Sequence, residues 1–202
     1  MSARTGRSRG RPPGGRPVAD KEAILNAAER VIARDGNGAS LDAIAAEAGI
    51  TKPVVYARVG DRADLSNALA ARLSDRIVDT ASLELAGRAF DREMLSVIFR
   101  STLETIGAHC EVFLYVTRGA ADDTSGQALY LASKSASPLA GLLAGWREES
   151  GQDTSVATPW AYAIIGMLNM VALWWIEEGQ PDVATLADQL VDLVWPGMRN
   201  HG

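Results

Sequence analysis

Few residues of this chain have side chains suited to acid–base, nucleophilic or metal chemistry. The 202 residues contain two histidines, His109 and His201, and one cysteine, Cys110. His201 lies in the C-terminal tail, so only His109 is a candidate base, and no motif places a nucleophile beside it. A single cysteine excludes an intramolecular disulfide and a Cys-pair metal site, and no further histidine completes a site around His109 and Cys110. The sequence therefore predicts no catalytic residue, no metal site and no cofactor.

A different chemistry, hydrogen bonding to DNA, is indicated by a predicted helix-turn-helix between residues 40 and 56. Ser40 is suited to cap a first short helix, and Gly49 suits the positive φ that ends it. Thr51 is suited to cap a second helix, which has Pro53 in its first turn. This layout places one helix in a DNA groove, although a glycine-bounded helix pair is also common as a corner of an all-α protein.

Apolar residues at helical spacing predict a further helix on each side of this pair. The preceding helix ends at Gly36, and the following helix opens at Asp61, with Asp64 three residues later. The apolar faces of these two helices are Ile24, Ala27, Ala28, Val31 and Ile32 in the first and Leu65, Leu69, Leu73 and Ile77 in the second. The helix-turn-helix is therefore expected inside a small head, which the long following helix leaves.

These stretches together resemble the DNA-binding head of TetR-family transcriptional regulators. The resemblance rests on residues 24–28, Gly36, residues 40–56 and residues 60–65. It implies that Thr51, Tyr56 and Arg62 hold DNA phosphates and that Lys52, Pro53 and Val54 face the bases. The family usually has His and Phe where this chain has Arg58 and Val59, and Arg58 is also within reach of a phosphate. The predicted DNA-binding residues are Ser40, Thr51, Lys52, Pro53, Val54, Tyr56, Arg58 and Arg62, with Arg9 and Arg11 in the N-terminal arm.

The charge of the chain is unevenly distributed, with the basic residues concentrated toward the N-terminus. The formal net charge is −5, yet residues 1–62 hold eleven Lys and Arg against seven Asp and Glu. The first 18 residues contain five Arg and no acidic residue, a composition that is expected to be disordered alone. Within them, Arg9-Gly10-Arg11-Pro12 resembles the core of an AT-hook, which binds a narrow A·T-rich minor groove. The alternative is a basic tail that contacts phosphates without sequence preference.

The rest of the chain predicts helices, with no alternating strand pattern. They cover about 90–118 as one helix or two, then 127–149, 159–178 and 182–195. The predicted fold is all-α, with a disordered basic arm at 1–18, a helix-turn-helix domain at 19–66 and a helical domain for effector binding and dimerisation at 67–202. Polar residues interrupt every apolar run of membrane-spanning length. The Arg-rich N-terminus is not followed by the apolar segment of a signal peptide. We therefore expect a cytoplasmic protein without a membrane partner.

The last two predicted helices are apolar on more than one side, which indicates that they are covered twice. In the TetR family these helices form a four-helix bundle across a two-fold axis, so the resemblance implies a homodimer. Such a dimer delivers two recognition helices to half-sites about 34–36 Å apart. The predicted interface residues are Trp174, Trp175 and Leu190. The alternative is that both helices belong to the core of a single chain.

The resemblance also implies a small-molecule cavity between the long helices. Its candidate wall residues are Phe113, Tyr115, Tyr130, Trp146, Met167, Asn169 and Met170, although Met and aromatic residues at helical spacing are also typical of a core. The predicted function is a homodimeric transcriptional repressor that an apolar or amphipathic effector releases from operator DNA. One alternative is a DNA-binding protein of the same fold without a small-molecule effector, and another is an all-α enzyme or carrier.

Overall fold

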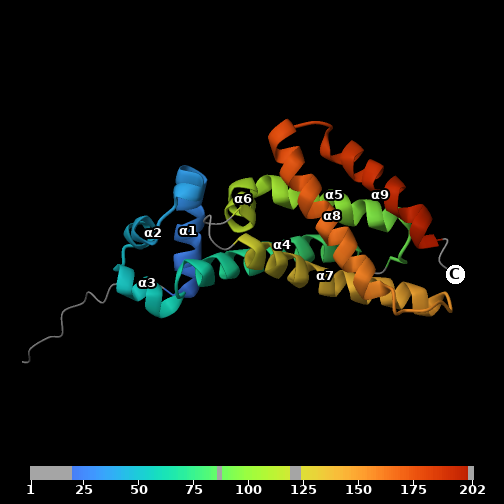
Figure 1. Cartoon of the computed structure of the whole chain (residues 1–202), viewed down its shortest axis with the longest axis horizontal. Coiled ribbons are helices and arrows are strands. Elements are labelled where there is room, and N and C mark those ends of the chain that lie inside the picture. The colour runs from blue at the N-terminus through green and yellow to red at the C-terminus, as the bar shows by residue number, and fades with distance from the viewer. Residues whose placement is uncertain (1–19, 86–87, 119–123, 200–202) are drawn as a thin grey trace, which may run out of the picture.

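The computed structural model describes residues 20–85, 88–118 and 124–199. Within these ranges every regular element is a helix (Figure 1), which confirms the predicted all-α fold. The helices are α1 (Lys21–Asp35), the short 3₁₀ turn η1 (Gly36–Gly38), α2 (Leu41–Glu47), α3 (Lys52–Arg58), α4 (Arg62–Leu85), α5 (Arg92–Ala108), α6 (Cys110–Arg118), α7 (Thr124–Glu149), α8 (Ala157–Glu178) and α9 (Val183–Arg199).

The head consists of α1, α2 and α3 packed against the start of α4, at one end of the molecule in Figure 1. Asp20 caps α1 by accepting a hydrogen bond from the Ala23 amide at 2.8 Å. The predicted apolar face of α1 is confirmed, since all its members are fully buried, as are Ile44 of α2 and Val55 of α3. Helices α1 and α3 both pack against α2, and their buried residues belong to one apolar core that continues through α4 into the body.

The long helix α4 connects the head to the rest of the protein. Its 24 residues span about 36 Å at 1.5 Å per residue. The predicted stripe of Leu65, Leu69, Leu73 and Ile77 is confirmed as buried, first under the head and then under α5 and α7. One apolar stripe therefore packs against both the head and the body, which α4 joins in Figure 1.

The body packs α5 to α9 around the second half of α4, with α7 against α8 and α5 against α9. His109 separates α5 from α6, so the predicted segment 90–118 forms two helices. The last helix runs to Arg199, beyond the predicted end at 195, although Pro196 lies inside it. A proline removes one backbone hydrogen bond, and burial of Met198 on the far side of Pro196 keeps the final turn packed.

Helix α8 is apolar on several sides. Among the described helices it is the one with the length and composition to cross a membrane, and 28% of its most apolar window is buried. Its amphipathic pattern is weak because apolar residues lie around most of its circumference. Much of this apolar surface is therefore exposed in a single chain.

Candidate nucleic-acid interface

The turn between α2 and α3 is held by capping interactions. Ser40 accepts a hydrogen bond from the Ala43 amide at 3.1 Å and so caps α2, and Gly49 takes φ of 67° at the end of this helix. The predicted side-chain cap by Thr51 is wrong, because the described part of the chain contains no such hydrogen bond. Pro53 has no N–H to offer, and the Val54 amide bonds to the Thr51 carbonyl at 2.9 Å instead. The Thr51 hydroxyl is left at the exposed start of α3.

Helix α3 divides into a buried face and an exposed face. Val55 is fully buried and anchors the helix in the head, while Val54 is half-buried. Thr51, Lys52, Pro53, Tyr56 and Arg58 are exposed, as is Ala57, so the structure leaves five of the predicted DNA-binding residues accessible on α3 and at its start. Tyr56 has 48% of its surface exposed, which is unusual for a large aromatic side chain in a packed head. This face offers hydroxyl groups and cations to a partner.

Lys52 at the start of α3 is paired with Asp42 of α2. The Lys52 ammonium lies 2.8 Å from the Asp42 carboxylate, and both side chains are exposed. This hydrogen bond raises the pKa of Lys52 above its ordinary value, so the side chain is fully charged at neutral pH. A base that Lys52 contacts therefore shares or replaces the contact with Asp42, since an ammonium has three donors.

The corner between α3 and α4 is built by two carboxylates and a glycine. The Asp64 amide donates to the Asp61 carboxylate at 2.9 Å, and the Asp61 amide donates to Asp64 at 3.1 Å. This reciprocal pair confirms that α4 opens at Asp61. Gly60 before it has φ of 96°, and a Cβ at this position would collide with the Asp64 side chain. Only glycine fits this corner without strain, and the corner sets where α3 stands relative to α4.

Arg62 at the start of α4 is engaged within the protein. Its guanidinium donates to the Ala39 carbonyl at 3.2 Å and to the Asn37 carbonyl at 3.1 Å. The same group lies over the ring of Tyr115 on α6, 5.2 Å from the ring centroid. This arrangement differs from the phosphate contact that the resemblance implied for Arg62.

Comparison with known proteins explains this arrangement of helices. The family model for bacterial regulatory proteins of the tetR family matches residues 24–69, from α1 into α4. An uncharacterised HTH-type transcriptional regulator of Mycobacterium tuberculosis is 27% identical over 189 residues, which cover 90% of this chain and 78% of that relative. The crystal structure of a TetR-like regulator from a Rhodococcus species is 28% identical, with a TM-score of 0.61 over 89% of this chain and 96% of that chain. The chain belongs to the TetR family of transcriptional regulators.

Two further solved structures share the fold at lower identity. The fatty acid degradation regulator FadR from Bacillus halodurans has a TM-score of 0.68 and 21% identity, over 87% of this chain and 98% of that chain. FadR from Bacillus subtilis, solved in complex with stearoyl-CoA, has a TM-score of 0.68 and 16% identity, over 86% of this chain and 96% of that chain. At these identities the likeness concerns the fold of the whole regulator, head and body together.

Three predicted residues have side chains that cannot be placed in this arrangement. Arg9 and Arg11 of the basic arm lie outside the described residues. The side chain of Tyr130 in α7 also lies outside the described part of the structure. The roles predicted for these three residues therefore stay predictions.

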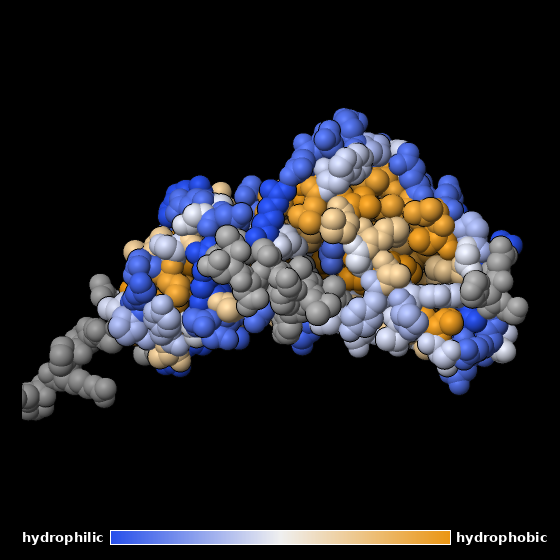
Figure 2. Space-filling model, in the orientation of Figure 1, coloured by the Kyte–Doolittle hydropathy of each residue, from blue (hydrophilic) through white to orange (hydrophobic). Residues whose placement is uncertain are grey.

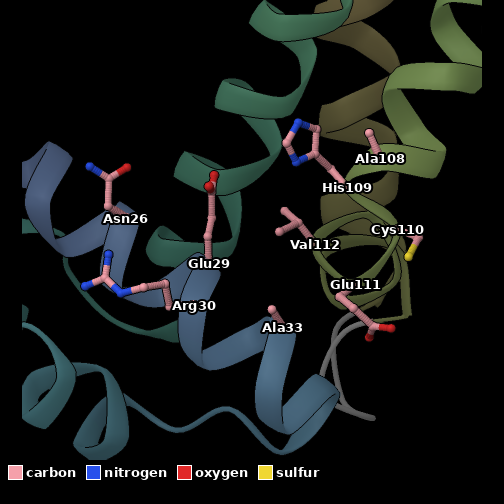
Figure 3. Close-up of a pocket in the computed structure, with 9 residues that line it drawn as sticks. All are labelled: Asn26, Glu29, Arg30, Ala33, Ala108, His109, Cys110, Glu111 and Val112. Atoms are coloured by element: carbon pink, nitrogen blue, oxygen red, sulfur yellow. The ribbon is translucent and has the colours of Figure 1, made fainter.

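A polar cleft of about 450 Å³ lies between the head and the body of the regulator. In Figure 3, α1, which carries Asn26, Glu29 and Arg30, lies across from the turn between α5 and α6, where His109 lies. Burial and the charge of Arg76 lower the pKa of His109. Glu29 is tied to α4, since its carboxylate lies 2.9 Å from the Arg76 guanidinium. The head therefore meets the α5–α6 turn across a cleft on this side.

A smaller cavity of about 60 Å³, partly open to solvent, lies in the body between α4, α5, α7 and α8. Its wall is mostly apolar, and Thr102 and Ser135 contribute hydroxyl groups. Ser135 is also hydrogen-bonded to Ser74 of α4 at 3.1 Å. The lining residues are Ile77, Val78, Ala81, Ser82, Ile98, Thr102, Ser135, Pro138, Leu139, Leu142 and Ile165.

Six of the seven residues predicted for the cavity wall do not line this cavity, and the seventh is Tyr130, whose side chain is not described. Phe113 and Tyr115 are buried in the core around α6. Trp146 packs in an aromatic cluster, with ring centroids 5.6 Å from Trp195 and 5.3 Å from Phe90. Met170 is 67% exposed, and Met167 and Asn169 are half-buried on α8. Residue type alone did not distinguish wall from core, because the cavity is lined mainly by aliphatic residues and small hydroxyl side chains.

An apolar surface covers α8 and α9, in the part of Figure 2 that corresponds to these helices in Figure 1. Trp174 is 48% exposed and Leu193 is 70% exposed. Trp175 is half-buried, and its indole N–H donates to the Pro181 carbonyl at 2.8 Å. Leu190 lies in the core of the single chain with 8% exposed, so it has little surface left for a partner. The sequence did not predict Leu193 and Tyr162 on this surface. Apolar periodicity shows that a helix has apolar sides, but not which of these sides the rest of the chain covers.

Proposed function

We propose that this TetR-family regulator is a homodimeric repressor that releases operator DNA when a small molecule occupies the cavity of the body. The observation that carries the proposal is the course of α4. Its residues Ile77, Val78 and Ala81 line the cavity, and its first residue, Arg62, lies in the head. A change in the cavity is therefore transmitted along one continuous helix to the DNA-binding end.

The proposed dimer uses the apolar surface of α8 and α9. Tyr162, Met170 and Trp174 are exposed at four- or eight-residue spacing, on one side of α8. Beside them, Trp160, Ile164, Val194 and Met198 line an apolar groove of about 280 Å³ between α8 and α9. A two-fold axis through this surface covers it and presents two α3 helices on one face of the DNA.

The proposed effector is an apolar or amphipathic molecule. The cavity wall is mostly apolar, and the hydroxyl groups of Thr102 and Ser135 suit one polar group of a ligand. A volume of about 60 Å³ holds the equivalent of about two water molecules at 30 Å³ each. An effector must therefore bind an expanded conformation of the body, and it weakens DNA binding only through its higher affinity for that conformation. The complex of Bacillus subtilis FadR with stearoyl-CoA makes fatty acids and acyl-CoA esters the first compounds to test.

The experiment begins with duplexes that the protein selects from a random DNA library. The proposal expects a dimer by light scattering, tight binding to a selected duplex that contains two half-sites, and release of this duplex by one of the compounds. A regulator that binds its operator while no compound alters binding would favour the alternative without a small-molecule effector. Absence of any selected duplex would contradict the proposed function as a whole.

A cavity-filling variant tests the position of the effector. Ala81→Leu adds bulk inside the cavity, whereas Thr80→Leu adds similar bulk on the exposed side of the same helix. Both variants are expected to bind the operator within a few-fold of the wild type. Only Ala81→Leu is expected to lose the response to the effector. A normal response in Ala81→Leu would place the effector outside this cavity.

A further inference from the structure

Arg62 connects three elements that belong to different parts of the regulator. It is the first residue of α4, and its guanidinium donates to the carbonyls of Asn37 and Ala39, which lie in the connection between α1 and α2. It also lies over the ring of Tyr115, a buried residue of α6. One side chain therefore joins the loop that precedes the helix-turn-helix to a helix of the body.

Other contacts between the head and the body surround the pair formed by Arg62 and Tyr115. On the neighbouring side, the cleft of about 450 Å³ separates α1 from the α5–α6 turn (Figure 3). The ion pairs of Glu29 with Arg72 and Arg76, at 3.6 and 2.9 Å, join α1 to α4, while α6 packs directly against α1 and η1. The contact between Arg62 and Tyr115 adds to this packing, and the same side chain also holds the loop at residues 37–39.

We infer that Arg62 is a positioning residue that holds the head at a defined angle to α6, rather than a phosphate ligand. Its guanidinium already donates to two carbonyl groups and lies over the Tyr115 ring, so any movement of the side chain toward a phosphate would break these contacts. Ala39 is fully buried, and leaving a polar group in such surroundings without its partner is costly. Retaining these contacts keeps Arg62 away from DNA and fixes the head.

This contact also lies on a route from the cavity to the head. Helix α6 packs against α4 and α7, and both of those helices contribute residues to the cavity wall. A shift of α7 and α4 around an effector therefore moves Tyr115, and Arg62 passes this movement to the loop at residues 37–39. The inference rests on the proposed function, since a head angle affects DNA affinity through the spacing of two heads in a dimer.

The salt dependence of operator binding distinguishes positioning from phosphate binding. Removing a phosphate contact makes the slope of log K against log salt shallower by about 0.9 for each contact. We expect Arg62→Gln and Tyr115→Leu to weaken binding to a selected operator by about 10-fold, within the usual range of coupling between sites, with slopes parallel to that of the wild type. Tyr115→Phe is the matched control, because it keeps the aromatic ring and is expected to bind normally.

The opposite pattern would overturn the inference. A shallower slope in Arg62→Gln, combined with normal binding by Tyr115→Leu, would identify Arg62 as a phosphate ligand. A double variant that loses the sum of the two single losses would show that Arg62 and Tyr115 act separately. An additive loss would therefore also contradict the inference.

A measurement without DNA keeps the inference separable from the proposed function. Spin labels at Ala46→Cys in α2 and Ser137→Cys in α7, in a Cys110→Ser background, report the distance between head and body. Labelled chains are diluted into unlabelled chains, so each dimer carries one labelled pair. We expect Arg62→Gln and Tyr115→Leu to broaden the distance distribution, and Tyr115→Phe to leave it unchanged. An unchanged distribution in Arg62→Gln would overturn the inference, whereas failure of the wild type to select any DNA would contradict the proposed function.

Discussion

The head and the body of this regulator differ in how completely a single chain covers their apolar surfaces. In the head, the apolar faces of α1, α2 and α3 close on one another, and the exposed face of α3 is mainly polar. The body contains a small cavity that is partly open to solvent, and it leaves the apolar surface of α8 and α9 exposed. Large exposed apolar surfaces mark binding sites in soluble proteins. The comparison indicates that a single chain covers the apolar faces of the head, whereas the body leaves apolar surface for a further partner.

Interactions of short range and of long range hold the two regions. Capping bonds in the head join residues three positions apart, as in the pairs Asp20 with Ala23 and Asp61 with Asp64. In the body, Arg92 of α5 reaches Asp192 of α9 at 2.6 Å, a hundred residues away in sequence. Local interactions are visible in a sequence, whereas long-range pairs depend on how helices pack.

The largest expected effect concerns the apolar surface of the body. The double variant Trp174→Glu and Leu193→Glu places four buried charges in the proposed dimer, because a two-fold axis repeats each substitution. We expect the dimer to lose at least about 4 kcal/mol, since truncating a single interface hot spot already costs about 2 kcal/mol or more. Sedimentation equilibrium should then show monomers that bind the operator weakly.

A matched control uses an exposed apolar residue elsewhere. Leu83→Glu changes a residue of α4 that is exposed and lies outside the α8–α9 surface. This variant is expected to remain a dimer. A double variant that stays dimeric would show that the two regions do not differ in the way proposed.

A second prediction concerns the polar surface of the head. Lys52→Ala should lower the affinity for a selected operator by about 1–3 kcal/mol if Lys52 contacts a guanine, and lower the affinity for scrambled DNA less. Fluorescence anisotropy titrations on both duplexes measure the difference. Arg100→Ala removes an exposed cation from α5 and serves as the control. Equal losses for both variants would mean that only overall charge matters.

A third prediction concerns the packing at the corner of the head. Gly60→Ala should destabilise the protein by about 1–3 kcal/mol, because the residue has positive φ and its Cβ would collide with Asp64. Gly145→Ala in α7 meets open space and is expected to be neutral or to stabilise by up to about 1 kcal/mol. Urea unfolding monitored by circular dichroism compares the two variants. Equal stabilities would show that the corner is less constrained than its geometry indicates.

The smallest expected effect lies between the two regions, at His109. Burial and the neighbouring Arg76 lower its pKa in the folded protein, so the unfolded chain takes up a proton at higher pH than the folded chain does. The stability that comes from this difference is complete above the unfolded pKa of about 6.5 and decreases as the pH falls below it. We expect His109→Gln to lose less stability than the wild type between pH 7.5 and 5.5 in thermal unfolding. Parallel losses would exclude His109 as the source.

The sequence predicted most of the head correctly because its signals are local. Helix faces, the glycine at position 49 and the carboxylates around the start of α4 lie within a few residues of what they stabilise. The same reasoning failed for the Thr51 cap, since the Val54 amide, three residues on, donates to the Thr51 carbonyl and not to its hydroxyl. The pair formed by Lys52 and Asp42 was missed because ten residues and a turn separate its members.

The residues of the body were harder to assign because their roles depend on which face of each helix is covered. The sequence located α5 to α9 closely, yet it placed aromatic and Met residues in the cavity and Leu190 at the interface. The structure lines the cavity with aliphatic residues such as Ile77 and Leu139 and buries Leu190 against the chain itself. An apolar residue looks the same in a sequence whether it faces a core, a cavity or a partner.

The sequence by itself determined the all-α fold and the helix-turn-helix, because these follow from spacing, capping and turns along a short stretch of chain, and the resemblance of these stretches indicated the TetR family. Only the tertiary structure decided that Arg62 contacts Tyr115, that the cavity lies beside α4, and that Trp174 and Leu193 remain exposed. Each of these depends on residues far apart in the chain, and their contacts exist only after several helices have packed at particular angles.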